Sequence, residues 1–398
     1  MPVRVLHLTT YTSGGAGRAA AALNRSMVKH GVESRLISAT GTKFRLAQRA
    51  ERSLRLLQRS PWRTWRSAAR FSSLTAKDIN ASSADIVNLH WVTDGFLSVE
   101  EIGRIEKPIV WTMHDMWPFT GTEHYAPEGP PLTRWQIGYS AANRSIDDSG
   151  PDLDRWTWDR KLRNWGNEPH LIPVSHWLAR LASESALAST WPTKVIPNVM
   201  DTTVFRPGPR EEARSRLGSD ASPLIAFTSS AGISDERKGW SYLQQAMVRV
   251  KETFPNAQVM VIGHSDPHEQ ARVSGDVLWM GEVGDNETMA ALLQSADVIA
   301  VPSTADNLPM TACEAQTCGR AVVAFDVGGI SDTLAHQESG YLATPFDTDD
   351  FAEGLILAIE DSRTSNSWGK QARMRAESLW EPATVVRQYE DLYAEVLS

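Results

Sequence analysis

The sequence predicts an α/β protein of two domains, each built on a parallel β-sheet with helices on both faces. Short apolar runs alternate with helix-length segments in both halves of the chain, which is the pattern of βαβ units. With 398 residues, 41% of them hydrophobic and 22% charged, the chain is long enough for two hydrophobic cores. A proline-containing segment separates the halves.

Four apolar runs are the predicted strands of the first half, at 3–9, 33–39, 84–91 and 108–115. Five more, at 223–230, 257–263, 276–281, 296–303 and 321–326, repeat the pattern more clearly in the second half. These runs predict a first domain over 1–195, a linker over 196–206 and a second domain over 207–375. The remaining 376–398 is expected to be a C-terminal helix that packs back toward the first domain.

Composition excludes several classes of protein. A formal net charge of -8 argues against a general nucleic-acid binder. The two cysteines, Cys313 and Cys318, are too few for a disulfide framework or a Cys-rich zinc site. The start of the chain lacks the apolar core of a signal peptide, and no run approaches the ~18 apolar residues of a membrane span. We therefore expect a cytoplasmic protein.

One segment, 43–71, is strongly basic and carries a single acid, Glu51. At 100° per residue a helix there would place arginines on one face and apolar residues on the other. The basic face is Arg45, Arg49, Arg52, Arg55 and Arg59, and the apolar face is Leu46, Ala50, Leu54 and Leu57. Trp62 and Trp65 follow. Two interpretations stay open: a cationic surface helix that packs its apolar face on the sheet, or an in-plane contact with an anionic membrane surface.

The stretch 301–332 sets Asp306 eight positions before Glu314, at the carboxyl end of a predicted strand. Pro309 suits the first turn of a helix, and Gly319 suits its left-handed end. Ligands of open α/β sheets bind at this edge. In the simpler interpretation, Asp306 or Asn307 caps the helix and Glu314 faces solvent.

Seven motifs in order resemble a known family. They are TSGGAGRAA, WTMHDMWPFTG, IPNVMDTTVFRP, DERKGW, MGEVGD, VPSTADNLPMTACEA and FDVGGISD. The chain resembles the family-four retaining glycosyltransferases of GT-B architecture, with two Rossmann-like domains facing across a cleft, and within them the exopolysaccharide (colanic-acid-type) enzymes. The resemblance implies transfer of a hexose from a nucleoside diphosphate sugar to a hydroxyl of a lipid-linked saccharide. It implies no metal and no cofactor besides the donor substrate.

The resemblance also implies roles for single residues. His114 would lie near the reacting carbon of the sugar, Lys238 with Arg237 would hold the leaving diphosphate, and Asp306 would bind hexose hydroxyls. Glu314 would accept hydrogen bonds from the ribose, and the backbone of Val283 would meet the base. The residues so implied for catalysis are His114, Lys238, Asp306 and Glu314, and those for donor binding are Gly15, Gly17, Arg237, Lys238, Val283, Asp306, Asn307, Leu308 and Glu314.

Three departures from the family pattern bear on this assignment. Asp306 stands where the family usually has glutamate, and Gly232 where it usually has arginine, which leaves Arg237 as a substitute. The stretch after WTMHDMWPFTG carries no cysteines, unlike that of close relatives.

Other interpretations remain. The run GAGRAA matches a dinucleotide fingerprint, but the second strand does not end in the acid that such a site needs. The Asp-x-Asp runs at Asp347 and Asp152 suit helix capping better than a metal. The alternatives for function are a transferase acting on a soluble small molecule and an inactive sugar-nucleotide-binding subunit.

Overall fold

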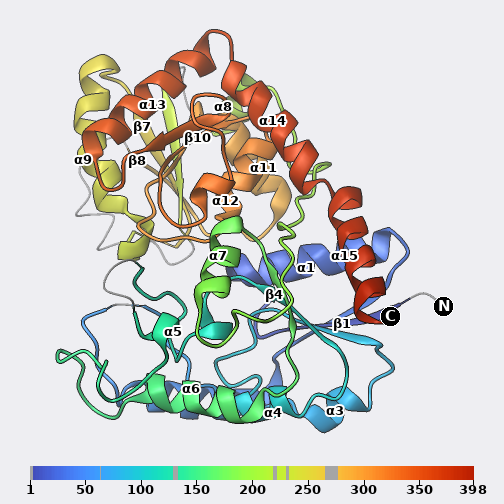
Figure 1. The fold of residues 1–398 in the computed structure, drawn as a ribbon. Coiled ribbons are helices and arrows are strands. Elements are labelled where there is room, and N and C mark those ends of the chain that lie inside the picture. The colour runs from blue at the N-terminus through green and yellow to red at the C-terminus, as the bar shows by residue number, and fades with distance from the viewer. Residues whose placement is uncertain (1–2, 63, 129–132, 218–221, 230–232, 265–276) are drawn as a thin grey trace. The chain divides into compact units, whose positions relative to one another are not determined.

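The computed structural model describes residues 3–62, 64–128, 133–217, 222–229, 233–264 and 277–398, and Figure 1 shows it as a ribbon. The chain divides into two compact units. The first unit is Met1–Pro197 with Val386–Ser398, and the second is Asn198–Val385. The division after Pro197 lies within the segment that was expected to be the linker.

The first unit is built on a five-stranded parallel sheet of order β2-β1-β3-β4-β5. Its strands are β1 (Arg4–Thr9), β2 (Glu33–Ser38), β3 (Ile86–Leu89), β4 (Ile109–Met113) and β5 (His170–Pro173). Its helices are α1 (Gly14–Lys29), α2 (Gly41–Arg55), α3 (Ala76–Asn80), α4 (Val99–Gly103), α5 (Arg134–Ile137), α6 (Leu153–Asn164) and α7 (His176–Glu184). The four predicted strands are confirmed. The fifth was missed because it is short and ends in a proline.

The basic segment begins as a helix, as predicted, but the prediction was wrong about where the helix ends and which residues it buries. The helix α2 ends at Arg55, and Arg59 instead forms a β-bridge with Ser149. The expected apolar face does not pack on the sheet, since Leu46 and Leu57 are exposed and the buried residues of α2 are Phe44 and Glu51. The Glu51 carboxylate accepts hydrogen bonds from the backbone N–H groups of 69–71, so the side of α2 that carries Glu51 faces the protein.

The second unit is built on a six-stranded parallel sheet of order β11-β10-β9-β6-β7-β8. Its strands are β6 (Leu224–Thr228), β7 (Gln258–Ile262), β8 (Val277–Gly281), β9 (Val298–Val301), β10 (Ala321–Phe325) and β11 (Gly340–Ala343). Its helices are α8 (Arg210–Leu217), α9 (Trp240–Thr253), α11 (Asn286–Ser295), α12 (Met310–Thr317), α13 (Thr348–Arg363) and α14 (Ser367–Trp380). The five predicted strands are confirmed, and β11 is additional.

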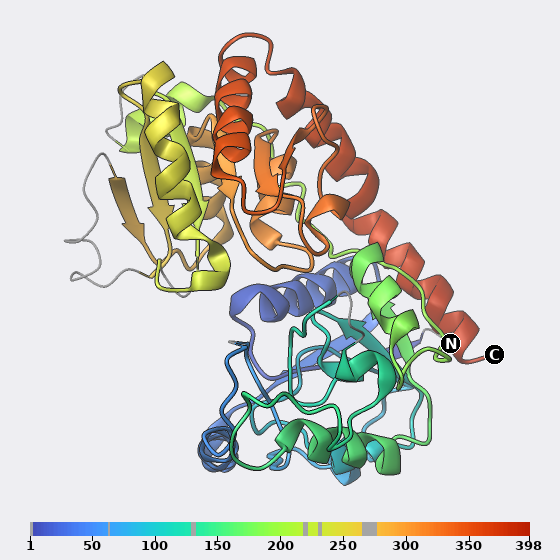
Figure 2. The same cartoon turned by 60° about the vertical axis from the view of Figure 1, so that its left-hand side comes forward.

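Alternating residues of each central strand serve two separate cores in the second unit. In β6, Ile225 and Phe227 join the core under α9 and α13, whereas Leu224 and Ala226 join the core under α11 and α12. Because both faces are covered, the strands read as continuous apolar runs. Figure 2 shows helices on the two sides of this sheet.

The end of the chain belongs to the first unit. The expected helix from 376 is in fact two helices, because α14 ends at Trp380 and α15 (Pro382–Val396) begins at a proline. The hydroxyl of Tyr389 lies 2.9 Å from the Thr112 hydroxyl, and the Asn88 amide donates to the Tyr393 hydroxyl at 3.1 Å. All four side chains are buried, so these hydrogen bonds tie α15 to the sheet of the first unit.

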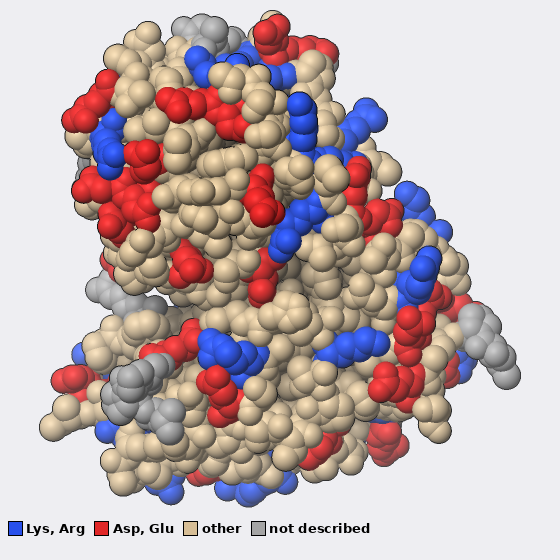
Figure 3. Space-filling model, turned by 45° about the horizontal axis from the view of Figure 1, so that its top comes forward, with Lys and Arg blue, Asp and Glu red and all other residues tan. Residues whose placement is uncertain are grey.

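The surface carries both signs of charge. On the face drawn in Figure 3, acidic and basic side chains lie interspersed over both units. Among the described helices, none combines the length and the apolar character needed to cross a bilayer.

Candidate functional site

A cluster of opposite charges lies at the carboxyl edge of the second unit's sheet. The chain leaves β9 and reaches Asp306, whose Oδ2 accepts a hydrogen bond from Lys238 Nζ at 2.7 Å and one from Arg237 Nη1 at 3.3 Å. The Asn307 backbone N–H donates to Oδ1 at 3.0 Å. Asp306 is only 8% exposed, so this is an ion pair largely withdrawn from water.

Burial alone would raise the pKa of the Asp306 carboxyl. The charges of Lys238 and Arg237, together with the Lys238 and Asn307 hydrogen bonds, outweigh burial and hold that pKa below its ordinary value. Asp306 is therefore ionised at neutral pH and balances two cations.

A tight turn presents these cations. Gly239 has a φ of 74°, and a Cβ at this position would lie 1.8 Å from the Pro302 carbonyl oxygen. The Thr304 backbone N–H donates to the Arg237 carbonyl at 2.8 Å. The turn is thus joined by backbone contacts to the loop that carries Asp306, and only glycine fits where the two loops meet.

The Gly-Gly pair after β10 holds the other side of this loop. Gly329 N–H donates to the Asp306 carbonyl at 3.0 Å, and a Cβ on Gly328 would lie 2.2 Å from the same oxygen. Gly328 also has a φ of 59°. The glycines therefore fix the backbone at Asp306.

The helix α12 follows directly. Pro309 was expected in the first turn of this helix but is its N-cap residue, one position earlier. Gly319 has the predicted left-handed conformation, with a φ of 68°. Glu314 is 1% exposed, and α12 has no side-chain cap. The simpler interpretation, a capping acid and a solvent-facing glutamate, is therefore wrong.

The other residues that were expected to bind the donor differ in their surroundings. Asn307 and Leu308 are buried beside Asp306, and Val283 follows β8 and packs partly buried against the α11 and α12 core. Gly232 lies outside the described residues.

The glycine turn of the first unit opens α1. A Cβ on Gly17 would lie 2.3 Å from the Tyr11 carbonyl oxygen, so Gly17 allows the helix to pack against the end of β1. A Cβ on Gly15 would meet nothing within 4 Å, and Gly15 is exposed. Only Gly15 of this pair has space beside it for a ligand.

His114 follows β4 and ends a row of three imidazoles. Its Nε2 lies 3.1 Å from His90 Nδ1, and His90 Nε2 lies 3.0 Å from His7 Nδ1. Burial lowers the pKa of His114 to about 4 and that of His7 to about 3. The sequence motifs did not point to His7 and His90, although a histidine within or next to an apolar strand was the available signal.

A second polar network lies behind His114. His124 contacts Asp115 Oδ2 through Nδ1 at 2.6 Å and Ser67 Oγ through Nε2 at 2.9 Å. The pattern has the order of a Ser-His-Asp triad, but Ser67 and His124 are buried and Trp91 Nε1 also donates to Asp115. The network therefore holds the 114–124 loop in place.

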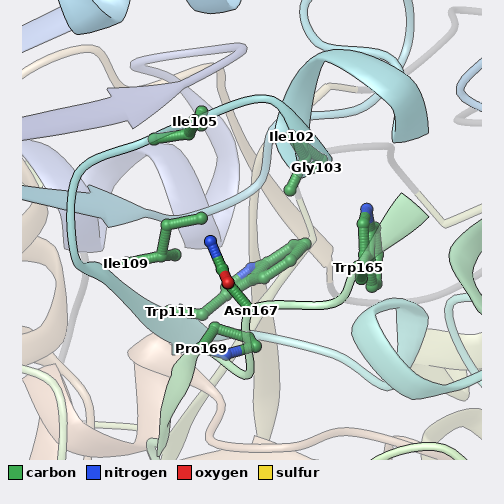
Figure 4. A pocket seen from close by; sticks show the side chains of 8 residues that line it. All are labelled: Ile102, Gly103, Ile105, Ile109, Trp111, Trp165, Asn167 and Pro169. Carbon is green, nitrogen blue, oxygen red and sulfur yellow. The ribbon is translucent and has the colours of Figure 1, made fainter.

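Two other features lie apart from these residues. A small apolar pocket at the opposite, amino end of β4 is lined by Ile102, Gly103, Ile105, Ile109, Trp111, Trp165, Asn167 and Pro169 (Figure 4).

Asp347 and Asp152 cap α13 and α6, as predicted. Within the described ranges, no three His, Cys, Asp or Glu side chains gather as a metal site.

Two family models match the chain. The model described as Glycosyltransferase Family 4 matches residues 13–204, and the model described as Glycosyl transferases group 1 matches 209–375.

Among related sequences, the D-inositol 3-phosphate glycosyltransferase of Segniliparus rotundus is 34% identical over 160 residues, 37% of this chain and 35% of that protein. The enzyme of the same name from Pseudarthrobacter chlorophenolicus is 25% identical over 78% of this chain and 71% of that protein. The phosphatidyl-myo-inositol mannosyltransferase of Mycolicibacterium smegmatis is 29% identical over 49% of this chain and 51% of that protein.

Solved structures share the fold over the whole chain. Sucrose-phosphate synthase from Thermosynechococcus elongatus has a TM-score of 0.68 at 16% identity, covering 99% of both chains. Anabaena HepE in complex with UDP-glucose has a TM-score of 0.64 at 16% identity, covering 98% of this chain and 99% of that one. Starch synthase IV of Arabidopsis thaliana with ADP and acarbose has a TM-score of 0.65 at 14% identity, covering 100% of both. These structures establish the GT-B fold of two parallel-sheet domains. The two family models together cover most of the sequence, and on their ground the chain belongs to the family 4 glycosyltransferases.

Proposed function

We propose that this glycosyltransferase moves a hexose from a nucleoside diphosphate sugar to a hydroxyl of a saccharide, with retention at the anomeric carbon. The observation that carries the proposal is the cation pair of Lys238 and Arg237, held by Asp306 at the carboxyl edge of a parallel sheet. Breaking the donor's glycosidic bond builds negative charge on the diphosphate, and two fixed cations stabilise that charge.

The helix α12 adds to this stabilisation. Its N-terminal turn follows Asn307 and Leu308 directly, and backbone N–H groups at the start of a helix favour a phosphate. When the donor binds, Lys238 exchanges its contact with Asp306 for the diphosphate, and Asp306 becomes available to hexose hydroxyls. Glu314 accepts hydrogen bonds from the ribose.

The mechanism we propose is a front-face displacement. The departing phosphate oxygen takes the proton of the attacking hydroxyl, so no side chain need act as the nucleophile and no metal is used. Activity should therefore survive a chelator. Activity that is lost with EDTA and restored by Mg²⁺ would refute the metal-free mechanism.

A panel of sugar nucleotides tests the donor assignment. Because the Anabaena structure holds UDP-glucose and the starch synthase holds ADP, the panel should include uridine, adenosine and guanosine diphosphate hexoses. A ligand at 100 times its dissociation constant adds ~2.7 kcal/mol of stability, which thermal unfolding detects. Binding without transfer to any acceptor would support the alternative, an inactive sugar-nucleotide-binding subunit.

We propose a lipid-linked acceptor, as in surface polysaccharide synthesis, and transient attachment to the inner face of the plasma membrane. The support is a set of exposed apolar side chains in the segment of the chain that also carries the arginines of α2, in which Leu46 is 60% and Leu56 74% exposed. The other exposed members of this set are Leu57, Trp62, Trp65 and Phe71. Leucine and tryptophan beside arginine suit the interface of an anionic bilayer.

The contacts of each arginine in the basic segment determine which arginines can be substituted without disturbing the fold. Arg52 donates to Asp94 at 3.1 Å, and Arg55 lies 4.3 Å over the Trp65 ring, so both also serve the fold. The exposed Arg45, Arg49 and Arg59 remain for lipid headgroups. Basic residues near an anionic surface contribute ~1 kcal/mol each.

Sedimentation with vesicles tests this attachment. Replacing Arg45, Arg49 and Arg59 by glutamine should weaken binding to anionic vesicles and leave donor affinity unchanged. The matched control replaces the exposed Arg25, Lys29 and Arg35, which removes the same charge from α1 and β2. Equal sedimentation with neutral and anionic vesicles would leave this surface without a membrane role.

A soluble acceptor such as an inositol phosphate is the second candidate, because the relatives from S. rotundus and P. chlorophenolicus are named for D-inositol 3-phosphate. Transfer assays with the identified donor, offered inositol phosphate in solution and a lipid-linked saccharide in vesicles, separate the two.

A further inference from the structure

Three imidazoles form a hydrogen-bonded row across neighbouring strands of the first unit. His7 lies in β1, His90 directly after β3 and His114 directly after β4, and these strands are adjacent in the sheet. The ring centroids are 5.3 Å apart for His7 and His90 and 5.4 Å apart for His90 and His114. The row starts in the buried core and ends at the carboxyl edge, where His114 is partly exposed.

The buried end of the row meets a thioether. His7 Nε2 lies 3.3 Å from Met27 Sδ on α1, and both residues are fully buried. A thioether sulfur accepts hydrogen bonds and donates none. His7 Nε2 therefore carries the proton and donates it to Met27 Sδ. Without that proton, two hydrogen-bond acceptors would face each other in the core, which is unfavourable.

Placing the His7 proton on Nε2 determines which nitrogen is protonated in each of the other two imidazoles. A neutral imidazole has one N–H and one acceptor nitrogen. With the proton of His7 on Nε2, its Nδ1 accepts from His90 Nε2–H, and His90 Nδ1 then accepts from His114 Nε2–H. The Nδ1 of His114 is left as the unprotonated nitrogen.

We propose that His7, His90 and Met27 are positioning residues that fix the tautomer of His114, so that its Nδ1 accepts a hydrogen bond from a substrate hydroxyl. The part that concerns substrate rests on the proposed function. The part that concerns the tautomer is a property of the folded first unit alone.

The surroundings keep the row neutral. Burial lowers the pKa of His90 well below its ordinary value, and the neighbouring imidazoles lower it further. Asp115 acts in the opposite sense on His114, but the effect of burial is larger and the pKa of His114 stays near 4. At neutral pH each of the three rings is therefore singly protonated. A doubly protonated ring would have no acceptor nitrogen, and the order of donors and acceptors along the row would be lost.

Nitrogen-15 NMR of the full-length protein with labelled histidines tests the tautomers. Protonated and unprotonated ring nitrogens differ in chemical shift and in their coupling to the hydrogens on the ring carbons. Single substitutions of each histidine assign the signals. We expect His7, His90 and His114 all protonated on Nε2. A wild-type His114 protonated on Nδ1 would overturn the proposal.

Met27→Leu removes the sulfur while keeping the volume, and should give a detectable population of His114 protonated on Nδ1. Met247→Leu, in the buried core of α9, is the matched control and should leave the His114 signals unchanged. Unchanged tautomers in Met27→Leu would show that Met27 does not set the direction.

His90→Gln breaks the row at its centre and covers the case in which Met27→Leu does not fold. We expect it to mix the tautomers of His114 and to lower kcat/KM about tenfold, the loss that follows from one misplaced hydrogen bond. Should no donor be turned over by the wild-type protein, the proposed function fails while the NMR result still decides the tautomer. Wild-type kcat/KM in His90→Gln would overturn the positioning role.

Discussion

At the scale of residues, the cluster around Asp306 shows what an aspartate contacts at the position where the resemblance leads one to expect glutamate. Its short side chain already contacts both cations, because the Gly239 turn brings Lys238 and Arg237 against the loop. The sequence predicted that Lys238, Arg237 and Asp306 act at one site, and the structure places them in contact, while their roles toward a donor stay a prediction. It could not predict the ion pairs, because they depend on backbone contacts between loops about 68 positions apart.

Lys238→Ala tests the role of the cation. The charge on the leaving diphosphate is largest in the transition state, so the change should lower kcat more than it raises KM for the donor. Steady-state kinetics with the donor as varied substrate measures this, and Lys238→Arg is the control that keeps a charge. A rise in KM alone would make Lys238 a ground-state binder.

Glu314→Gln tests the buried carboxylate. The substitution keeps the shape of the side chain but removes a charged acceptor worth about 1.5–3 kcal/mol, so donor affinity should fall by one to two orders of magnitude. Calorimetric titration with the donor reports the loss. Glu287→Gln, exposed on α11, should change nothing, and an unaltered affinity in Glu314→Gln would remove the ribose role.

At the scale of elements, the strands were predicted well, whereas for the helix α2 neither its end nor its buried face was predicted. Strands buried on both faces are continuous apolar runs, and such runs were found in both halves. The orientation of α2 depends on polar contacts that apolar periodicity does not register. Gln48 donates to Asp94 at 3.0 Å, and Glu51 accepts from backbone N–H groups of 69–71. These contacts leave Leu46 exposed.

Gly328→Ala tests the turn that supports Asp306. A Cβ there meets the Asp306 carbonyl, and the left-handed φ of 59° costs roughly 1–2 kcal/mol for alanine. We expect the melting temperature of the second unit to fall by about 2–8 °C and the donor to bind at least tenfold more weakly. Gly284→Ala is the control, since a Cβ there meets nothing within 4 Å. Donor affinity equal in both variants would contradict this.

At the scale of the whole molecule, the chain is organised as two units of which the first includes the end of the sequence. Periodicity predicted two sheets and a boundary, because each half alternates strands with helices. It did not predict that Tyr389 and Tyr393 contact Thr112 and Asn88, since such pairs lie about 300 positions apart. Asn88 is the register partner of His7, so the Tyr393 hydroxyl contacts the face of the sheet that also carries the imidazole row.

This polar face should make the stability of the first unit depend on pH. His7 is neutral when folded, with a pKa lowered to about 3, whereas an unfolded histidine takes up a proton below about pH 6.5. The contribution of neutral His7 to the stability of the first unit is therefore fully present above pH 6.5, and it is lost as the pH falls from 6.5 toward 3. The loss amounts to ~1.4 kcal/mol for each pH unit below 6.5.

Glu123 acts in the opposite sense. Burial and the nearby Asp154 raise the pKa of Glu123 to about 7, so between pH 7 and about 4.5 the folded chain holds a proton that the unfolded chain releases. Its contribution to stability therefore grows as the pH falls over that range. The total pH dependence of the wild-type protein mixes these two effects with those of other buried groups, including His90 and His114, whose pKa values are also lowered. A single variant must therefore isolate His7.

His7→Leu provides this separation, because it leaves Glu123 in place. Between pH 7.5 and 5.5 the variant should lose about 1.4 kcal/mol less stability than the wild type, or roughly 3–6 °C less in melting temperature. Tryptophan fluorescence suits the measurement, since most of the 15 tryptophans lie before residue 197. His30→Leu, an exposed histidine after α1, should behave as the wild type. Equal pH dependence in His7→Leu and the wild type would mean that His7 is not held neutral by the fold.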